Sequence, residues 1–219
     1  SLWNYEIGAK TSWLDNRLIA NVVAYYIDWS DIQLRTFDSV SLSQRIQNVA
    51  KAEVYGLETE IRYQATDSLQ LSLNYGYTDA TMAEDFLDTS TDPATVLAAN
   101  GQTLPGSAKD TISLFADWTL SLTSDLDLQA HASYIYLSSH PNSLVSGGLV
   151  GESPDTPRSE VVNLSVGLIH QNGVTVSLFA NNLLDDRNIQ YQASFGPAPL
   201  ETIGFDRPRV IGLRAGYKF

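Results

Sequence analysis

The chain of 219 residues contains no cysteine, one methionine and three histidines. Without cysteine it can form no disulfide, thiolate metal site, iron–sulfur cluster or thiol nucleophile. Positive charge is also scarce, because 13 Lys and Arg stand against 25 Asp and Glu and give a net charge of −12. A broad basic surface is therefore excluded, and we expect no nucleic-acid partner.

Long hydrophobic runs, helical periodicity and catalytic motifs are missing as well. No stretch reaches the roughly 18 consecutive apolar residues of a membrane helix. Neither HExxH nor Gly-x-Ser-x-Gly occurs, and a triad built on His131 would need residues from other strands. We expect a protein that is not an enzyme, with no catalytic residues, no cofactor and no metal site.

What the chain does contain is alternation of apolar and polar residues, the pattern of a strand between two different media. It is clearest in residues 69–78, where Leu69, Leu71, Leu73, Tyr75 and Tyr77 share one side. Residues 57–64, 126–136 and 211–219 repeat it, and weaker versions cover 3–14, 18–34, 111–120, 160–170 and 174–182. The sequence predicts an all-β fold with about nine strands and no helix.

The connections between these strands alternate between short and long. Short ones lie at 15–17, 65–68, 121–125 and 171–173, and long ones at about 35–50, 80–110, 137–159 and 183–208. An up-and-down antiparallel sheet would therefore carry its short turns at one end and its long loops at the other.

Three features favour a transmembrane β-barrel over a soluble sandwich. Several strands reach the roughly ten residues that cross a bilayer at a tilt. Their apolar faces carry no charge in the middle, where Arg or Lys would cost about 2–4 kcal/mol. Aromatic residues gather near both strand ends, as in the two aromatic girdles of outer-membrane barrels: Trp13, Tyr63, Trp118, Tyr217 and Phe219 at one, and Tyr26, Tyr75, Tyr77, Tyr134 and Tyr136 at the other.

Particular stretches then suggest a family. The closing residues 207–219, which read RPRVIGLRAGYKF, resemble the terminal strand of TonB-dependent outer-membrane receptors. Residues 21–33 with 48–60 are similar to a strand–loop–strand of those barrels, and residues 178–187 to their penultimate strand. The usual aromatic after the last of these stretches is delayed to Tyr191. The resemblance implies that Tyr217 and the C-terminal Phe219 form the signal read by the barrel-assembly machinery.

The resemblance also implies a larger whole. Plugged outer-membrane transporters have about 22 strands, so we expect residues 1–219 to be the C-terminal portion of a receptor barrel, with no plug domain present. The implied location is the bacterial outer membrane, and the implied function is TonB-energised uptake of an iron–siderophore or a similar bulky nutrient. The implied partners are outer-membrane lipids, the receptor's own N-terminal plug domain, the TonB–ExbB–ExbD complex and the barrel-assembly machinery.

Two groups of residues are candidates for function. Cationic and aromatic residues of the long loops suit an anionic aromatic chelate: Arg35, Phe37, Tyr191, Phe195, Phe205 and Arg207. Polar-phase strand residues would face the lumen or the plug: Glu58, Glu60, Arg62, Asp127, His131 and Arg214. The alternatives are loop-to-loop packing for the first group and simple cross-strand pairing for the second.

Three other readings of the whole chain stay open at this point. The first is a small stand-alone outer-membrane barrel that acts as a porin or an adhesin. The second is an outer-membrane hydrolase. The third is a soluble β-sandwich that serves as a binding module, which predicts a monodisperse protein without detergent.

Overall fold

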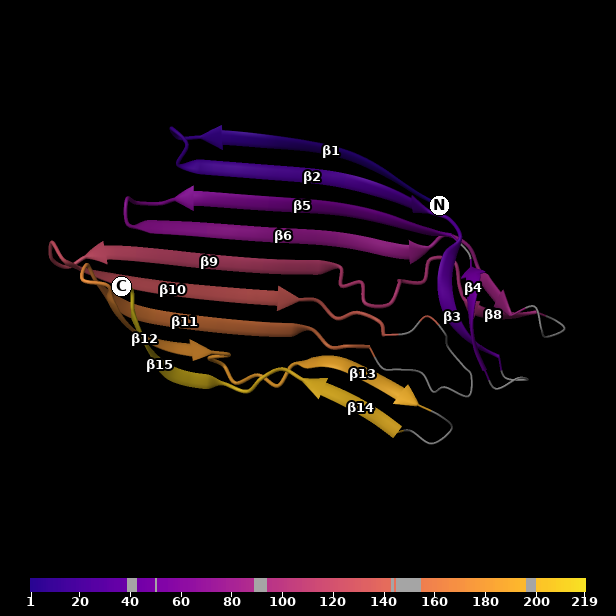
Figure 1. Ribbon diagram of the computed structural model, residues 1–219. Coiled ribbons are helices and arrows are strands. Elements are labelled where there is room, and N and C mark those ends of the chain that lie inside the picture. Colours follow the sequence, from indigo (N-terminus) through magenta and orange to yellow (C-terminus); the bar gives the residue numbers. More distant parts are fainter. Residues whose placement is uncertain (39–42, 50, 89–93, 143, 145–154, 196–199) are drawn as a thin grey trace.

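Nine long strands form one antiparallel sheet in the computed structural model, which describes residues 1–38, 43–49, 51–88, 94–142, 144, 155–195 and 200–219. The order across the sheet is β1-β2-β5-β6-β9-β10-β11-β12-β15 (Figure 1). The strands are β1 Leu2–Trp13, β2 Leu18–Trp29, β5 Ala52–Gln64, β6 Leu69–Met82, β9 Asp110–Ser121, β10 Leu126–Leu137, β11 Ser159–His170, β12 Val174–Asn181 and β15 Val210–Tyr217. The expected all-β, up-and-down antiparallel fold is confirmed.

All four short turns lie at one end of the sheet (Figure 1). The β1–β2 turn passes through Leu14, Asp15 and Asn16, all with positive φ, and the β11–β12 turn uses Gly173 at φ 93°. Arg17 joins two neighbouring turns, because its guanidinium donates to the carbonyls of Gln64 and Ala65 at 3.1 and 2.7 Å. Hydrogen bonds from Arg17 therefore link the β1–β2 turn to the β5–β6 turn at this end of the sheet.

The other end carries the long connections, and here the structure adds elements that alternation did not predict. Three two-stranded hairpins lie within these connections: β3 Ile32–Asp38 with β4 Ser43–Val49, β7 Phe86–Asp88 with β8 Thr95–Ala98, and β13 Ile189–Phe195 with β14 Leu200–Phe205. The stretch 18–34 is not one strand, since it breaks at Asp31, whose φ is 58°. Strands β7 and β8, with three and four residues, are too short to show a clear period of two.

The register assigns each side chain of the nine strands to one of two faces. We call the polar face the one formed by even-numbered residues of β1, β5, β6 and β15 and odd-numbered residues of β2, β9, β10, β11 and β12. The remaining residues form the apolar face. In the nine strands, the apolar face holds no Lys or Arg, and its acidic residues stand only at the ends nearest the long loops: Asp28, Glu53, Asp79, Asp110 and Glu160.

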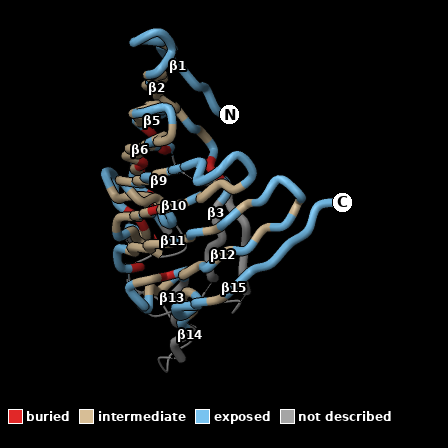
Figure 2. The backbone as a smooth tube through the Cα atoms, turned by 90° about the vertical axis from the view of Figure 1, so that its left-hand side faces the viewer, coloured by how far each residue is buried: buried red, intermediate tan, exposed pale blue. Residues whose placement is uncertain are grey.

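The sheet is curved, and its edge strands β1 and β15 lie far apart (Figure 2). Large hydrophobic side chains of the apolar face stay exposed, with Ile7 and Leu213 each at 77%. Burial is instead concentrated near the long loops, around Met82, Phe86 and Leu144. Within the described residues no helix is long and apolar enough to cross a membrane.

Candidate functional site

The six polar-phase candidates all lie on the polar face. Glu58, Glu60 and Arg62 occupy successive even positions of β5, and Asp127 and His131 stand on β10. Arg214 of β15 joins them through its partner Ser177 on β12. Alternation therefore predicted that these six residues share one face of the sheet.

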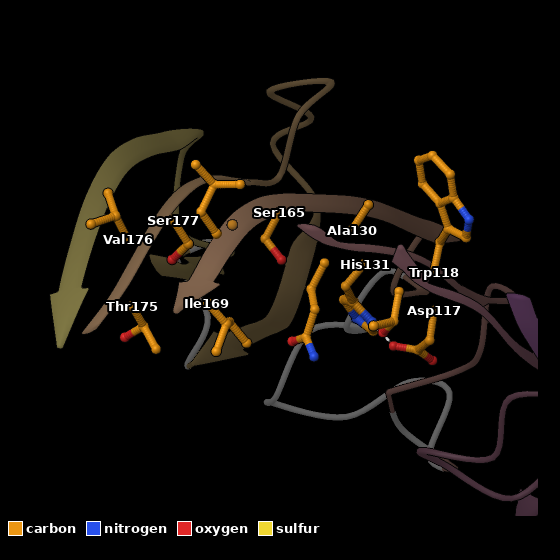
Figure 3. A pocket seen from close by; sticks show the side chains of 13 residues that line it. Asp117, Trp118, Ala130, His131, Ser165, Ile169, Thr175, Val176 and Ser177 are labelled. Atoms are coloured by element: carbon orange, nitrogen blue, oxygen red, sulfur yellow. Dashed lines mark hydrogen bonds and ion pairs between the residues drawn. The ribbon is translucent and has the colours of Figure 1, made fainter. Parts of the chain in front are cut away.

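The closest contact among ionisable side chains described on this face joins His131 to Asp117 of the neighbouring strand β9. His131 Nδ1 lies 2.7 Å from Asp117 Oδ1, and the two side chains point toward one another, whereas Trp118 and Ala130 point to the opposite side (Figure 3). The Phe115 ring stacks beside the imidazole with centroids 6.2 Å apart. A carboxylate on Nδ1 fixes the orientation of the ring and leaves Nε2 available to a partner.

This pair borders a shallow hollow of about 340 Å³, together with Gln129, Ser165 and Ser177. Cross-strand pairing explains why these residues meet, since His131 lies opposite both Asp117 and Ser165. Asp117 shares the polar phase of the alternation in the sequence, but its contact with His131 depends on the register between β9 and β10.

A second hollow of about 450 Å³ lies on the same face over β1, β2, β5, β6 and β9. Glu58 and Glu60 line it with Lys10 and Asn74. Asn21 donates to Glu60 over 3.0 Å, and the Arg62 guanidinium stands 3.5 Å from the same carboxylate. Glu60 is thus held by its neighbours. Glu58 lies between Val23 and Gly76, which offer it no side-chain hydrogen bond.

Two aromatic rings of the polar face lie over glycines of the adjoining strand. A Cβ on Gly56 would stand 1.9 Å from Tyr25 Cζ, and the Tyr25 hydroxyl forms a 3.1 Å hydrogen bond with Thr78. A Cβ on Gly212 would stand 2.7 Å from Phe179 Cζ. The glycines therefore let large rings rest directly against the adjoining strand.

The Phe179 ring also carries a cation. The guanidinium carbon of Arg214 lies 5.3 Å from its centroid, within the range of a cation–π interaction. Arg214 is thereby positioned on the polar face by an uncharged partner.

On the apolar face, tyrosine hydroxyls bind the carboxylates near the long loops. The hydroxyl of Tyr75 donates to Asp110 over 2.8 Å, and that of Tyr134 donates to Glu160 over 3.3 Å. Lys109, in the connection before β9, lies 3.0 Å from Asp79. Hydrogen bonding to Asp79 and its charge hold the pKa of Lys109 above the ordinary lysine value.

Two of the long connections are packed together. Met82, which ends β6, forms a buried cluster with Phe86 and Ala98 of the β6–β9 connection and with Leu144, which follows β10. Gln102 adds a hydrogen bond from its side chain to the carbonyl of Leu144 over 2.9 Å. The described parts of these two connections therefore pack against each other at this end of the sheet.

The connections on either side of the β13–β14 hairpin are held by two asparagines. Asn182 donates to the carbonyls of Asp186 and Arg207 at 2.9 and 3.0 Å. Asn188 exchanges two hydrogen bonds with the main chain of Glu160, at 3.0 and 3.3 Å. Residues 178–187, which resembled a penultimate receptor strand, thus include the asparagine that links the end of β12 to the segment after β14.

The loop candidates are spread over two hairpins. Arg35 and Phe37 belong to β3, and Tyr191 and Phe195 belong to β13, but their side chains lie outside the described residues. Phe205 ends β14 with 56% of its surface exposed, and exposed Arg207 follows it. Phe205 and Arg207 thus lie two residues apart, at the end of β14 and directly beyond it.

The last strand, β15, pairs with β12 along its whole length, from Val210 to Tyr217. Tyr217 and Phe219 form an edge-to-face pair with centroids 4.9 Å apart, at the end that carries the short turns. Both rings are exposed. They form part of the aromatic row that the sequence predicted for this end.

Comparison with known proteins agrees with this architecture. Residues 2–183 match the family model described as TonB dependent receptor-like, beta-barrel. The chain is similar to the ferric yersiniabactin uptake receptor FyuA of Yersinia pestis, at 17% identity and a TM-score of 0.75, over 100% of this chain and 30% of that one. It is also similar to the siderophore receptor PiuA of Acinetobacter baumannii, at 18% identity and a TM-score of 0.74, over 100% of this chain and 28% of that one.

A third similar structure is the closed form of the ferric-catecholate import receptor Fiu of E. coli K12, at 23% identity and a TM-score of 0.68, over 99% of this chain and 27% of that one. The chain thus spans less than a third of the length of these receptors. The family and the fold are those of transport receptors and not of enzymes. Because the family model matches well over half of the sequence, the chain belongs to the TonB-dependent receptor β-barrel family.

Proposed function

We propose that residues 1–219 form the C-terminal portion of the β-barrel of an outer-membrane receptor that imports a ferric siderophore, or a similarly scarce and bulky nutrient, with energy delivered through TonB. The observation that carries the proposal is the family match over residues 2–183. The similar structures named above are receptors for ferric yersiniabactin, for a siderophore and for ferric catecholates, which favours an iron chelate as the cargo.

The two faces of the sheet suit this role. An apolar face without Lys or Arg fits contact with outer-membrane lipids, and a polar face fits a lumen that holds water or a plug. About thirteen further strands would complete a 22-stranded barrel. In this arrangement Glu58, Glu60, Arg62, Asp127, His131 and Arg214 face the plug domain, and the long loops face the outside of the cell.

The C-terminal end has a role of its own in this proposal. Tyr217 and Phe219 stand at the short-turn end, which would be periplasmic, and would be read by the barrel-assembly machinery. Replacing Phe219 by Ala in the full-length protein should lower the amount of assembled barrel several-fold, whereas Lys218→Ala should not. Equal amounts of assembled protein in the two variants would remove this part of the proposal.

Transport is tested with the complete gene in a Gram-negative host that lacks its own siderophore receptors. Uptake of radioactive iron is measured for a panel of ferric siderophores, with and without TonB and with a protonophore. We expect uptake of at least one chelate that requires TonB and the proton-motive force. Uptake that survives loss of TonB would favour a passive porin instead. A reading frame that starts with a signal peptide directly before Ser1 would exclude the larger barrel.

A further inference from the structure

The apolar face of the sheet has a hollow of about 490 Å³ that extends over β5, β6, β9, β10 and β11. None of the described residues that line it is charged, whereas charged residues border both hollows of the polar face. Leu71 and Leu114 line it and are 38% and 43% exposed, so the hollow is open to the outside of the sheet. The ligand class that suits such a lining is apolar.

A pair of alanines produces this hollow. Ala116 of β9 lies directly opposite Ala132 of β10, and in the nine strands no other two alanines of the apolar face are paired. The Cβ atoms of such a pair are only about 4.5–5.5 Å apart, so two methyl groups lower the surface at one place. The next row toward the long loops rises again at Leu114, which lies between Leu73 and Tyr134. We call this depression the alanine dent.

A depression of this kind needs an occupant in a membrane. Lipid tails are as apolar as the lining, so association there depends on packing rather than on transfer out of water. Atoms that border a void lose their dispersion contacts on that side. Water is a poor occupant, because it needs two to four polar partners, and methyl groups stand at the centre of the dent. The occupant must therefore be apolar, slender and flexible.

The position of the alanine dent along β9 fits the length of a lipid tail. Ala116 lies six residues from Asp110, which begins the strand at its long-loop end. Six residues span about 20 Å of strand, which at a tilt of about 45° is about 14 Å of depth, close to half of the roughly 30 Å hydrocarbon core. The dent therefore lies about one leaflet below the long-loop end.

Charges of both signs stand at that end, on the same side of the sheet. Lys109 and Arg158 lie 3.0 and 3.6 Å from the carboxylates of Asp79 and Glu160, and the Arg158 side chain is 71% exposed. A lipid phosphate can approach the two cations, and a headgroup amine can approach the carboxylates. The charged end and the apolar dent thus match the two ends of one amphiphile.

We propose that the alanine dent is a binding site for one acyl chain of a lipid whose headgroup lies at the long-loop end of the sheet. Leu71, Leu73, Leu114 and Tyr134 would border the chain, and the methyl groups of the two alanines would lie beneath it. This inference rests on the proposed function, because it requires the apolar face to lie in the outer membrane. It adds one position at which a chain is held in preference to the rest of that face.

The site is tested on the full-length receptor in nanodiscs of phosphatidylethanolamine, a small part of which carries a photoreactive diazirine at the end of one acyl chain. After illumination, the labelled residues are located by mass spectrometry. We expect label on Leu114, Ala116 and Ala132 several-fold above the label on the apolar-face residues of β12 and β15. Even labelling of the nine strands in the wild type would overturn the site without any variant.

The double variant Ala116→Leu/Ala132→Leu fills the alanine dent and should reduce its label to the level of β12 and β15. The matched control is Ala180→Leu, which adds the same side chain to the same face between Leu164 and Ile211 and should leave the label unchanged. Label on β9 and β10 that survives in the double variant would contradict the proposal.

Two further outcomes separate the site from its rivals. A receptor dimer in detergent that the double variant converts to a monomer would assign the alanine dent to a second copy of the chain and would overturn the acyl-chain site. Absence of TonB-dependent iron uptake by the wild type would instead refute the proposed function, and the labelling result would stand on its own.

Discussion

The side-chain amide of Asn182 donates a hydrogen bond to the carbonyl of Arg207, 25 residues further along the chain, over 3.0 Å. The same side-chain amide also donates to the carbonyl of Asp186. The side-chain oxygen of Asn182 accepts a hydrogen bond from the main-chain amide of Asp186 over 3.2 Å. Asn182 is buried, and its main chain adopts a φ of 50°, in the left-handed region. One asparagine thus joins the end of β12 to both segments that lead into the β13–β14 hairpin.

Replacing Asn182 by Ala should loosen this hairpin. Two carbonyls and one amide would lose their partner, and each buried polar group left unpaired costs about 1–3 kcal/mol. Alanine is also strained at a φ that asparagine tolerates better. We expect faster hydrogen exchange and proteolytic cleavage within residues 183–209, with little change in the strands beyond.

The control for this variant is Asn172→Ala at the short-turn end. Asn172 accepts one hydrogen bond, from the amide of Val174 over 3.1 Å, in an exposed turn. We expect Asn172→Ala to leave the hydrogen exchange and proteolytic cleavage of residues 183–209 unchanged. Protection there that is unchanged by Asn182→Ala would show that the hairpin is held by other contacts.

Gly56 should not accept a side chain while Tyr25 keeps its place. An alanine Cβ would stand 1.9 Å from Tyr25 Cζ, so the ring must swing away and its 3.1 Å hydrogen bond with Thr78 is lost. Overpacking of this kind costs about 1–3 kcal/mol. We expect Gly56→Ala to lower the temperature at which the full-length barrel loses its folded band on semi-native gels.

A double-mutant cycle separates this clash from the loss of glycine itself. In a Tyr25→Ala background, Gly56→Ala meets no ring and should cost much less than in the wild type. If the two substitutions prove additive, the contact between ring and glycine is not the cause of the instability.

The two faces of the sheet were predictable because a period of two can be recognised within a single strand, without knowing which strands lie beside it. The twelve residues of β10 show it alone, and the register places Asp127 and His131 on the face that alternation assigned to them. The β7–β8 hairpin was not predictable, because β7 has three residues and β8 four, too few for a periodic signal.

The contacts of the site were less predictable than the faces. The pair formed by His131 and Asp117 depends on the register between β9 and β10, which the sequence of either strand does not fix.

The pair formed by Lys109 and Asp79 should make the stability of the barrel fall in alkaline solution. Because the pKa of Lys109 is raised, the stabilisation is fully present below the ordinary lysine value of about 10.4 and is lost as pH rises through the raised pKa. The pair is partly exposed, so solvent screening limits its contribution to about 1 kcal/mol or less.

Lys109→Met should abolish this part of the pH dependence. Folded-band temperatures at pH 8 and pH 11 would therefore differ less in the variant than in the wild type. An unchanged difference between the two pH values would assign the alkaline loss of stability to other groups.

Adjacent residues of β6 offer the sharpest test of which face meets lipid. Leu73 lies on the apolar face opposite Ile61 and Leu114, and Asn74 lies on the polar face opposite Glu60 and Ser113. An arginine near the middle of the lipid-facing side costs about 2–4 kcal/mol, so Leu73→Arg should sharply reduce the amount of folded receptor in the outer membrane. Asn74→Arg places the same side chain beside a carboxylate on a wet surface, so it should fold in amounts close to the wild type. The reverse order of the two variants would mean that the faces are assigned the wrong way round, and with them the lumen position of every polar-face residue.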